Sequence, residues 1–520
     1  MPRIVYLPLD ERPCNARFPL QIAAATELEP VSPPLRMLGA KKRPADTKLL
    51  AEWLLEETAA AHALIVSLDM LVYGGIVPSR LHRLSAVQCR ARLQTIVECK
   101  KRNPKLRIYA FNLIMRAPAY SSSDEEPDYY AQYGAEIARN GWLQDKQERD
   151  GLSEAERQEW ERLLAVLPRE VLSDFTGRRQ VNAAVNRMAV QMADEGWIDM
   201  LVVPLDDNAR FGYSSAEQRR LLLEAAGRRV LDRVHLYPGA DEVGCTLFAR
   251  VFCDTMHYRP NVFVRYSSTA GLGVIPKYED RSLGESVKSQ LTAAGCAICD
   301  HASEADVVLM IHSPPVGQHL MAETSDSLAG RNAAYFSEVN VREFAHAIRR
   351  YAEKGATIAL ADAAVCNGAD TVLMELLSGS GLLKHLSAYA GWNTAGNTLG
   401  TVIAHAVVES YYRKAEKASP GSARARNSEA FLLSRFVEDW GYQAILRSRI
   451  AREELPGLGG STFDVSAVHD EVAGRIRSGM LAFIERELRD FEPARIRLER
   501  VELPWKRMFE VGFELRIGAD

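Results

Sequence analysis

The stretch Met200-Leu-Val-Val-Pro-Leu-Asp206-Asp207 is a short, continuous apolar run that ends in two carboxylates. A run of this kind, without polar alternation, is typical of a strand buried on both faces, as in a parallel sheet covered by helices. Segments with apolar residues at helical spacing separate such runs. The runs recur along the chain, beginning at Arg3, Ala63, Leu106, Val234, Asn261, Asp306 and Thr357.

This alternation of strands and helices, repeated about eight times, predicts an α/β fold, either a (β/α)8 barrel or tandem doubly wound sheets. Polar residues follow many of the strands, and a barrel directs all of its strand ends into one site, so we favour a barrel-like main domain. We expect it at 1–412, with a helix-rich insertion at about 118–195. An exposed linker and a smaller α+β region at 428–520, ending in a hairpin, are expected to follow.

Composition narrows the class of protein. Hydrophobic residues make up 47% and charged residues 25%, as in ordinary globular proteins. The 64 Lys and Arg residues nearly balance the 68 Asp and Glu residues, so the net charge of -4 predicts no nucleic-acid or membrane partner. The N-terminus does not resemble a secretory signal and no apolar stretch reaches the roughly 18 residues of a membrane span, so we expect a cytoplasmic location. The eight scattered cysteines do not suggest a disulfide framework.

The densest group of polar residues is the one that follows Leu205. Two adjacent carboxylates, Asp206 and Asp207, repel each other, so one of them should have a raised pKa unless a cation or a metal compensates. A raised pKa suits a general acid, so we expect both to be catalytic, with Asn208 and Arg210 beside the substrate. Capping of the following helix is the structural alternative.

Other runs also end in polar residues, which we expect to line the same pocket. For each of them an ion pair, a turn or a helix cap is the alternative explanation. These predicted binding residues are Asp10, Glu11, Arg12, Asp69, Arg116, Asp241, Glu242, Asp362, Asn367 and Asp370.

Near the end of the α/β pattern, Trp392, Asn393 and Asn397 stand among small residues. An indole can stack on a sugar ring while carboxamides bind its hydroxyl groups, so these residues are also predicted to bind substrate. A core tryptophan followed by a helix cap is the alternative. His312 could act as a base or a metal ligand, but a lone strand-end histidine is more often structural.

Familiar cofactor and nucleophile motifs are absent from the sequence. It has no Walker loop, no three-glycine dinucleotide fingerprint, no His-Glu-x-x-His and no Gly-x-Ser-x-Gly. We therefore expect no cofactor and no resident metal.

Two resemblances add to this interpretation. Through Leu7-Pro-Leu-Asp10-x-Arg12-Pro13, Val203-Pro-x-Asp206-Asp207-Asn208 and Ala390-Gly391-Trp392-Asn393, most of the chain resembles a bacterial family known as domain of unknown function 4127. That resemblance implies an architecture of its own and no particular activity. A strand that ends in Asp-Asp is also similar to the catalytic pair of retaining hexosaminidases of the O-GlcNAcase type. On that pattern Asp206 would polarise the substrate acetamido group and Asp207 would protonate the leaving oxygen.

The hypothesis from sequence is a glycoside hydrolase that acts on a small N-acetylhexosaminide, by substrate-assisted retaining catalysis. Its partner would be a small carbohydrate, and a homo-oligomer is compatible with the sequence. Two alternatives stay open. One is a divalent-metal hydrolase, lyase or isomerase with ligands among Asp10, Asp69, Asp207 and Asp241. The other is a sugar-binding protein without catalysis.

Overall fold

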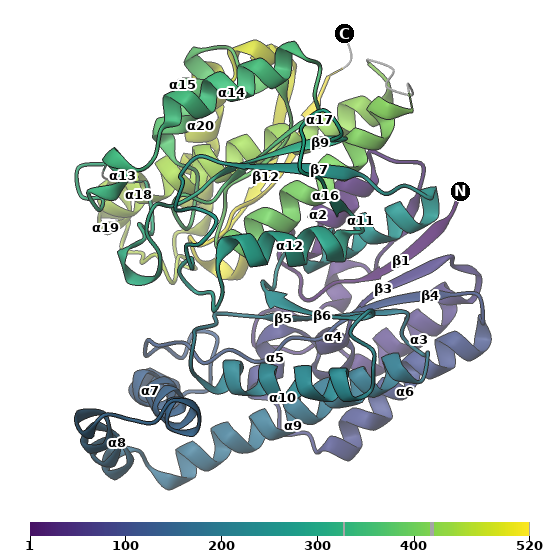
Figure 1. The fold of residues 1–520 in the computed structure, drawn as a ribbon, viewed down its shortest axis with the longest axis vertical. Helices are drawn as coiled ribbons and strands as arrows, with labels where there is room; N and C mark the ends of the chain where they lie inside the picture. The colour runs from purple at the N-terminus through teal and green to yellow at the C-terminus, as the bar shows by residue number, and fades with distance from the viewer. Residues whose placement is uncertain (326–327, 416–420, 519–520) are drawn as a thin grey trace. The chain divides into compact units, whose positions relative to one another are not determined.

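The computed structural model describes residues 1–325, 328–415 and 421–518. The chain divides into two compact units, each with its own parallel sheet (Figure 1). Unit 1 comprises Met1–Glu11, Glu29–Gly244 and Tyr278–Asp280. Unit 2 comprises Arg12–Leu28, Cys245–Lys277 and Arg281–Asp520.

Unit 1 contains a six-stranded parallel sheet in the order β2-β1-β3-β4-β5-β6. Almost all residues of its central strands are buried, as expected for apolar runs covered by helices on both faces. The chain proceeds from β1 to β2 on one side and then to β3 on the other side of β1, so the order reverses there. The strands are β1 (Arg3–Leu7), β2 (Glu29–Val31), β3 (Ala63–Ser67), β4 (Arg107–Phe111), β5 (Met200–Leu205) and β6 (Val234–Pro238).

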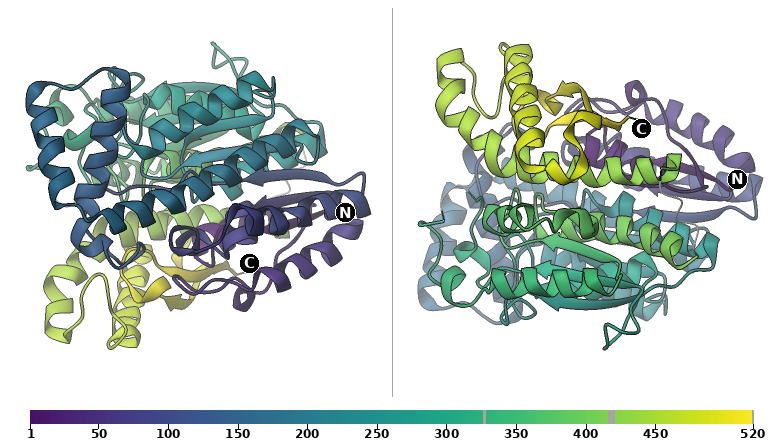
Figure 2. Two further views of the ribbon diagram at one scale, coloured as in Figure 1. Left: turned by 90° about the horizontal axis from the view of Figure 1, so that it is seen from below. Right: turned by 90° about the horizontal axis from the view of Figure 1, so that it is seen from above.

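Several helices of unit 1 begin at a residue whose side chain caps the first turn. Ser85 forms a capping box with Gln88 at the start of α6, and Ser67 caps the short helix that follows β3. Three long helices fill the segment between β4 and β5, where we expected a helix-rich insertion (Figure 2). The main helices are α3 (Thr47–Glu57), α4 (Leu68–Tyr73), α5 (Ile76–Leu81), α6 (Ala86–Arg102), α7 (Tyr130–Arg149), α8 (Glu154–Val166), α9 (Arg169–Asp194) and α10 (Tyr213–Gly227).

Unit 2 contains a five-stranded parallel sheet in the order β11-β10-β9-β7-β8 and an antiparallel hairpin. The sheet strands are β7 (Asn261–Tyr266), β8 (Ala297–Ile298), β9 (Val307–His312), β10 (Ile358–Asp362) and β11 (Leu386–Ala390), and the hairpin is β12 (Ile496–Glu502) with β13 (Gly512–Ile517). Its helices are α1 (Pro13–Ala16), α2 (Phe18–Ala23), α12 (Leu283–Ala294), α13 (Ala334–Ser337), α14 (Val341–Glu353), α15 (Thr371–Gly379), α16 (Ala395–Lys414), α17 (Ala423–Arg435), α18 (Arg447–Arg449), α19 (Leu455–Leu458) and α20 (His469–Glu487). Helix α11 (Val243–Met256) begins in unit 1 and continues in unit 2, and α17 leads into a π-helical segment at Phe436–Leu446.

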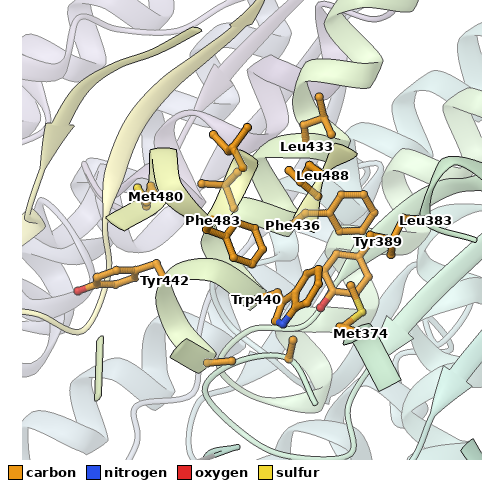
Figure 3. Close-up of a cluster of buried hydrophobic side chains, with 14 of the residues drawn as sticks. Met374, Leu383, Tyr389, Leu433, Phe436, Trp440, Tyr442, Met480, Phe483 and Leu488 are labelled. Carbon is orange, nitrogen blue, oxygen red and sulfur yellow. The ribbon is translucent and has the colours of Figure 1, made fainter. Parts of the chain in front are cut away.

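One apolar core joins the second sheet to the C-terminal part of the chain. The ring of Tyr389 of β11 lies 4.9 Å from that of Phe436 in the π-helical segment, tilted by 36°. Trp440 packs edge-on at 4.8 Å against Phe483 of α20 (Figure 3). The hairpin lies against α17 and α20 in the same unit. The expected boundary between 1–412 and 428–520 therefore falls inside unit 2, and residues 416–420 of the expected linker lie outside the described residues.

A closed (β/α)8 barrel is not confirmed, since the parallel strands form separate sheets of six and five strands. Polar residues at the carboxyl ends of strands had favoured the barrel. Open parallel sheets also place their ligand sites at these ends, beside the point where strand order reverses, so that pattern fits both architectures.

Candidate functional site

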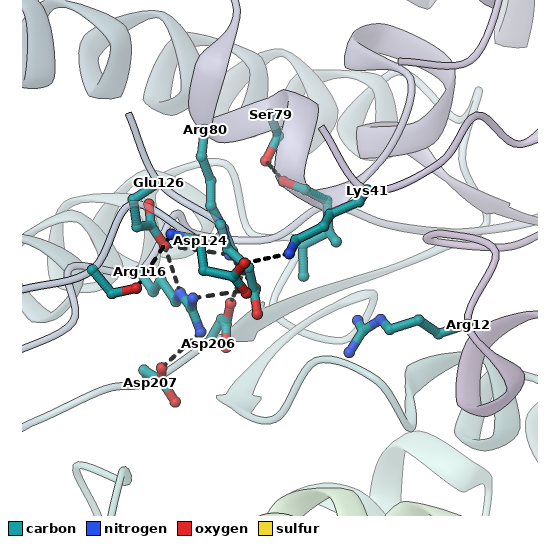
Figure 4. A network of polar contacts seen from close by, with 12 residues as sticks. Arg12, Lys41, Ser79, Arg80, Arg116, Asp124, Glu126, Asp206 and Asp207 are labelled. Carbon is teal, nitrogen blue, oxygen red and sulfur yellow. Dashed lines mark hydrogen bonds and ion pairs between the residues drawn. The ribbon is translucent and has the colours of Figure 1, made fainter. Parts of the chain in front are cut away.

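The two catalytic candidates follow β5 at the carboxyl edge of the first sheet. Arg80 of α5 donates from Nη2 to Asp206 Oδ2 at 2.7 Å, and Arg116, which follows β4, donates from Nη1 to Asp207 Oδ2 at 3.0 Å. Adjacent carboxylates are thus held by different guanidinium groups (Figure 4). A left-handed backbone at Asp207, with φ of 38°, accompanies this divergence.

Two further carboxylates, Glu125 and Glu126, complete the network. Arg80 Nη1 lies 2.8 Å from Glu125 and 3.3 Å from Glu126. Arg116 contacts the same two glutamates at 3.2 Å through Nη2 and 2.8 Å through Nε. Four carboxylates therefore share the two guanidinium groups.

The surroundings of Asp207 shift its pKa. Burial and the neighbouring Asp206 raise the pKa of Asp207 to about 6, although Arg116 and Arg80 oppose the shift. The side chains of Asp206 and Asp207 keep 14% and 22% of their surface exposed, whereas that of Arg80 keeps 2%. The network thus presents to solvent a carboxyl group with a raised pKa, next to a second carboxyl group that pairs with Arg80.

Asp69 lies at the topological switch point of this sheet, where the strand order reverses between β1 and β3. It follows β3, is 3% exposed, and accepts a hydrogen bond from the Leu113 N–H at 2.9 Å. Burial raises its pKa to about 7, against the hydrogen bonds from Leu113 and Asn112 and the charge of Arg80. Asp10 follows β1 at the same edge of the sheet and is also buried.

Other predicted residues of unit 1 have local structural partners. Glu11 accepts a hydrogen bond from the Lys41 N–H at 2.7 Å, and Asn208 accepts one from the Ser215 hydroxyl at 3.1 Å. Glu242 accepts one from the Ala240 N–H at 2.9 Å, within its own turn.

Two more predicted residues of unit 1 differ in exposure. Arg210 is exposed and lies over the ring of Phe211, and Asp241 is buried where the chain leaves β6.

The remaining predicted residues belong to unit 2. Trp392 is 6% exposed, donates from Nε1 to Thr401 at 3.2 Å, and packs edge-on against Phe18 at 5.8 Å. Its ring is part of a packed interior, as in the alternative weighed above. Asn367 and Asn393 both have left-handed backbones, with φ of 51° and 56°, and the Asn367 N–H donates to Asn393 O at 2.9 Å.

Two other predicted residues of unit 2 have structural contacts as well. Asn397 lies in the first turn of α16, where its N–H donates to Thr394. Arg12 pairs with Glu510 at 2.9 Å and lies over the Trp505 ring. Asn397 thus contributes to the N-terminal turn of α16, and Arg12 forms a buried ion pair.

A second polar cluster surrounds Asp370, the N-cap of α15. Its Oδ2 accepts hydrogen bonds from Arg331 Nη1 at 2.8 Å and from His312 Nε2 at 3.1 Å, and its N–H donates to Asp362 at 2.8 Å. Burial disfavours the charged His312, but the hydrogen bond to Asp370 and the charges of Asp362 and Asp370 together outweigh burial and raise the His312 pKa. Burial raises the pKa of Asp362 to about 6.

A family model described as a protein of unknown function (DUF4127) matches residues 4–514. The chain belongs to this family. No curated protein and no solved structure matches the chain. Membership in DUF4127 confirms the first resemblance and carries no activity with it.

Several further features bear on what this DUF4127 protein could bind. Among residues 1–325, 328–415 and 421–518, no group of three His, Cys, Asp or Glu side chains is arranged to hold a metal ion. Within the same described residues, no helix is long and apolar enough to cross a membrane. A hollow of about 300 Å³ between α7, α9 and α10 is lined by none of the predicted site residues.

Sequence reasoning missed Arg80, Glu125, Glu126 and Arg331. Arg80 carried a signal, because it is the lone charge in the apolar stretch Ile76-Val-Pro-Ser-Arg80-Leu. The two glutamates lie in a polar loop, and nothing in their spacing indicates a buried partner.

Proposed function

We propose that this DUF4127 protein is a glycoside hydrolase that cleaves a small N-acetylhexosaminide, with Asp207 as the general acid and Asp206 as the fixed anion. One observation carries the proposal: adjacent carboxylates are held by separate arginines, and burial raises the pKa of Asp207 to about 6. Two carboxyl groups with unlike environments are what glycosidic cleavage requires.

In the proposed reaction, Asp207 gives its proton to the glycosidic oxygen as the bond to the anomeric carbon breaks. Arg116, at 3.0 Å, then stabilises the aspartate that remains. Asp206 stays ionised beside Arg80 and polarises the acetamido group, whose carbonyl oxygen attacks the anomeric carbon. Water opens that intermediate, and Asp207 takes back a proton.

Aryl N-acetylhexosaminides of both anomeric configurations test the proposal on the purified full chain. Asp207→Asn should lower kcat about 100-fold or more, since a positioned general acid contributes about 10²–10⁴. The loss should be smaller for a dinitrophenyl than for a methylumbelliferyl leaving group, because a good leaving group needs less protonation. Asp206→Asn should lower kcat for acetamido sugars more than for the corresponding plain hexosides.

The matched control is Asp232→Asn, which removes an exposed carboxylate elsewhere in unit 1 and should leave both rates unchanged. Because Asp207 must carry its proton, kcat/KM should fall as the pH rises above about 6. Absence of turnover on every glycoside, or an Asp207→Asn enzyme with the parental rate, would refute the proposal. Loss of activity after chelator treatment would favour the metal-dependent alternative.

A further inference from the structure

The second sheet has its own topological switch point. The chain passes from β7 to β8 on one side, and β9 then lies on the other side of β7, so strand order reverses between β7 and β9. In open parallel sheets, ligand sites form in the crevice outside the carboxyl ends of the strands at such a point. The residues that leave β7 and β9 at this edge are Ser267 and His312.

These two residues are joined to Asp370 in a continuous relay. His312 Nδ1 lies 2.9 Å from Ser267 Oγ, and His312 Nε2 lies 3.1 Å from Asp370 Oδ2. The three side chains come from the ends of the adjacent strands β7 and β9 and from the turn that follows β10. A serine, a base and an orienting carboxylate within hydrogen-bond reach form the arrangement that activates a serine nucleophile.

Burial and further contacts suit the three residues to these roles. His312 and Asp370 are 0% and 3% exposed, whereas Ser267 is half-buried. Arg331 donates to Asp370 at 2.8 Å and fixes its carboxylate. With Nε2–H donated to Asp370, the lone pair on Nδ1 is directed at the Ser267 hydroxyl. The Ser313 N–H also donates to Ser267 Oγ, at 3.0 Å, which stabilises negative charge on that oxygen.

We propose that Ser267, His312 and Asp370 form a nucleophilic triad that hydrolyses carboxylic esters of small acyl groups. Ser267 Oγ attacks the ester carbonyl carbon while His312 Nδ1 takes the hydroxyl proton. The tetrahedral intermediate breaks the bond to the alkoxy oxygen, which leaves with that proton from His312. Water then attacks the acyl-serine, gives a proton to His312, and releases the carboxylic acid as Ser267 recovers its proton.

Close packing beside the nucleophile favours a small acyl group. A Cβ added at Gly271 would lie 2.1 Å from Ser313 Oγ, so the segment that follows Ser267 is pressed against the chain that follows β9. This site lies in unit 2 and uses none of the groups assigned to the glycosidase reaction.

Two probes test the triad on the full chain: an alkyl fluorophosphonate, which phosphorylates activated serines, and p-nitrophenyl acetate. We expect one label per chain on the peptide that contains Ser267, and an initial burst of nitrophenol. Ser267→Ala should abolish the label and lower kcat/KM for the acetate at least about 100-fold. Ser289→Ala is the matched control, since it removes a partly exposed hydroxyl of α12 in the same unit and should retain label and hydrolysis.

Substitution of His312 would disturb the buried cluster, so the role of His312 as a base is tested through a second variant at position 267. In Ser267→Cys, the thiol should be alkylated by iodoacetamide at least tenfold faster than the partly exposed thiol of Ser289→Cys, as followed by peptide mass. The proposal is overturned when the parent protein is not labelled, when Ser267→Ala is labelled like the parent, or when the two thiols react alike. Aryl-glycoside turnover should be the same in Ser267→Ala and the parent, so each of the two proposed activities can be refuted independently of the other.

Discussion

Asp69 offers a quantitative test of the electrostatics at the carboxyl edge of unit 1. Burial raises its pKa from 3.8 to about 7, so the folded protein holds a proton that the unfolded chain has released. Between these two values the unfolding free energy falls as the pH rises. The full shift of roughly three units corresponds to about 4 kcal/mol, of which about 2.5 kcal/mol develops between pH ~5 and ~8.

Asp69→Asn removes the ionisation while the amide oxygen can still accept the Leu113 N–H. The variant should therefore be about as stable as the parent in acid and gain stability over it as the pH rises. Urea unfolding of both proteins at several pH values measures this difference, and shifts at other carboxyl groups cancel in the comparison. Asp46→Asn is the control, because Asp46 is an exposed N-cap and asparagine caps equally well. A difference between Asp69→Asn and its parent that stays constant from pH 5 to 8 would refute the assigned shift.

Two further substitutions test how buried groups of unit 2 are used. Arg435 is 1% exposed, lies over the Phe18 ring, and contacts Glu438 and Asp439, so Arg435→Met should lower the unfolding free energy by about 3–5 kcal/mol at pH ~8. Burial raises the pKa of Asp439 to about 7, so the loss should shrink at pH 5, where that carboxyl carries its proton; an equal loss at both pH values would contradict this account. Trp392→Phe should lower stability by about 1–3 kcal/mol and leave KM for aryl glycosides unchanged. A raised KM with parental stability would instead place the indole against the substrate.

Strand positions were predictable because buried strands leave a local signature. The runs at Met200–Leu205 and Val307–His312 are continuous apolar segments, and both form central strands. The C-terminal hairpin was also predictable from the sequence, because β12 and β13 alternate apolar and polar residues. The two strands pair as expected. The order of strands within a sheet is a non-local property, and neither periodicity nor strand-end polarity encodes whether the sheet closes.

Of the candidate site, only the residues that directly follow a strand could be predicted from the sequence. Asp206 and Asp207 were visible because a carboxylate pair after an apolar run is unusual, and the structure pairs each with an arginine. Arg80 belongs to a helix and Glu126 to a loop, so their meeting depends on tertiary packing.

At Trp392 the structure favours the structural alternative, a tryptophan packed in the core. The small and amide-bearing residues around it suggested an open pocket. The structure uses them for turns and close packing: Asn393 has a left-handed backbone, and a Cβ on Gly391 would lie 2.7 Å from Tyr389 Oη.

Both units have aspartates with raised pKa values at the carboxyl ends of their strands. Burial raises the pKa of three aspartates that lie at the carboxyl ends of strands: Asp69 and Asp207 in unit 1, and Asp362 in unit 2. Each lowers the stability of the folded state when it ionises, so an asparagine that kept the hydrogen bonds would be the more stable choice at neutral pH. Functional sites are where proteins retain such groups. A net charge of only -4 conceals this pattern, because Arg80 and Arg116 in unit 1 and Arg331 in unit 2 offset part of the acidity at the same edges. The glycosidase chemistry that we propose for unit 1 therefore rests on a carboxyl group, Asp207, that the arginines of that unit only partly neutralise.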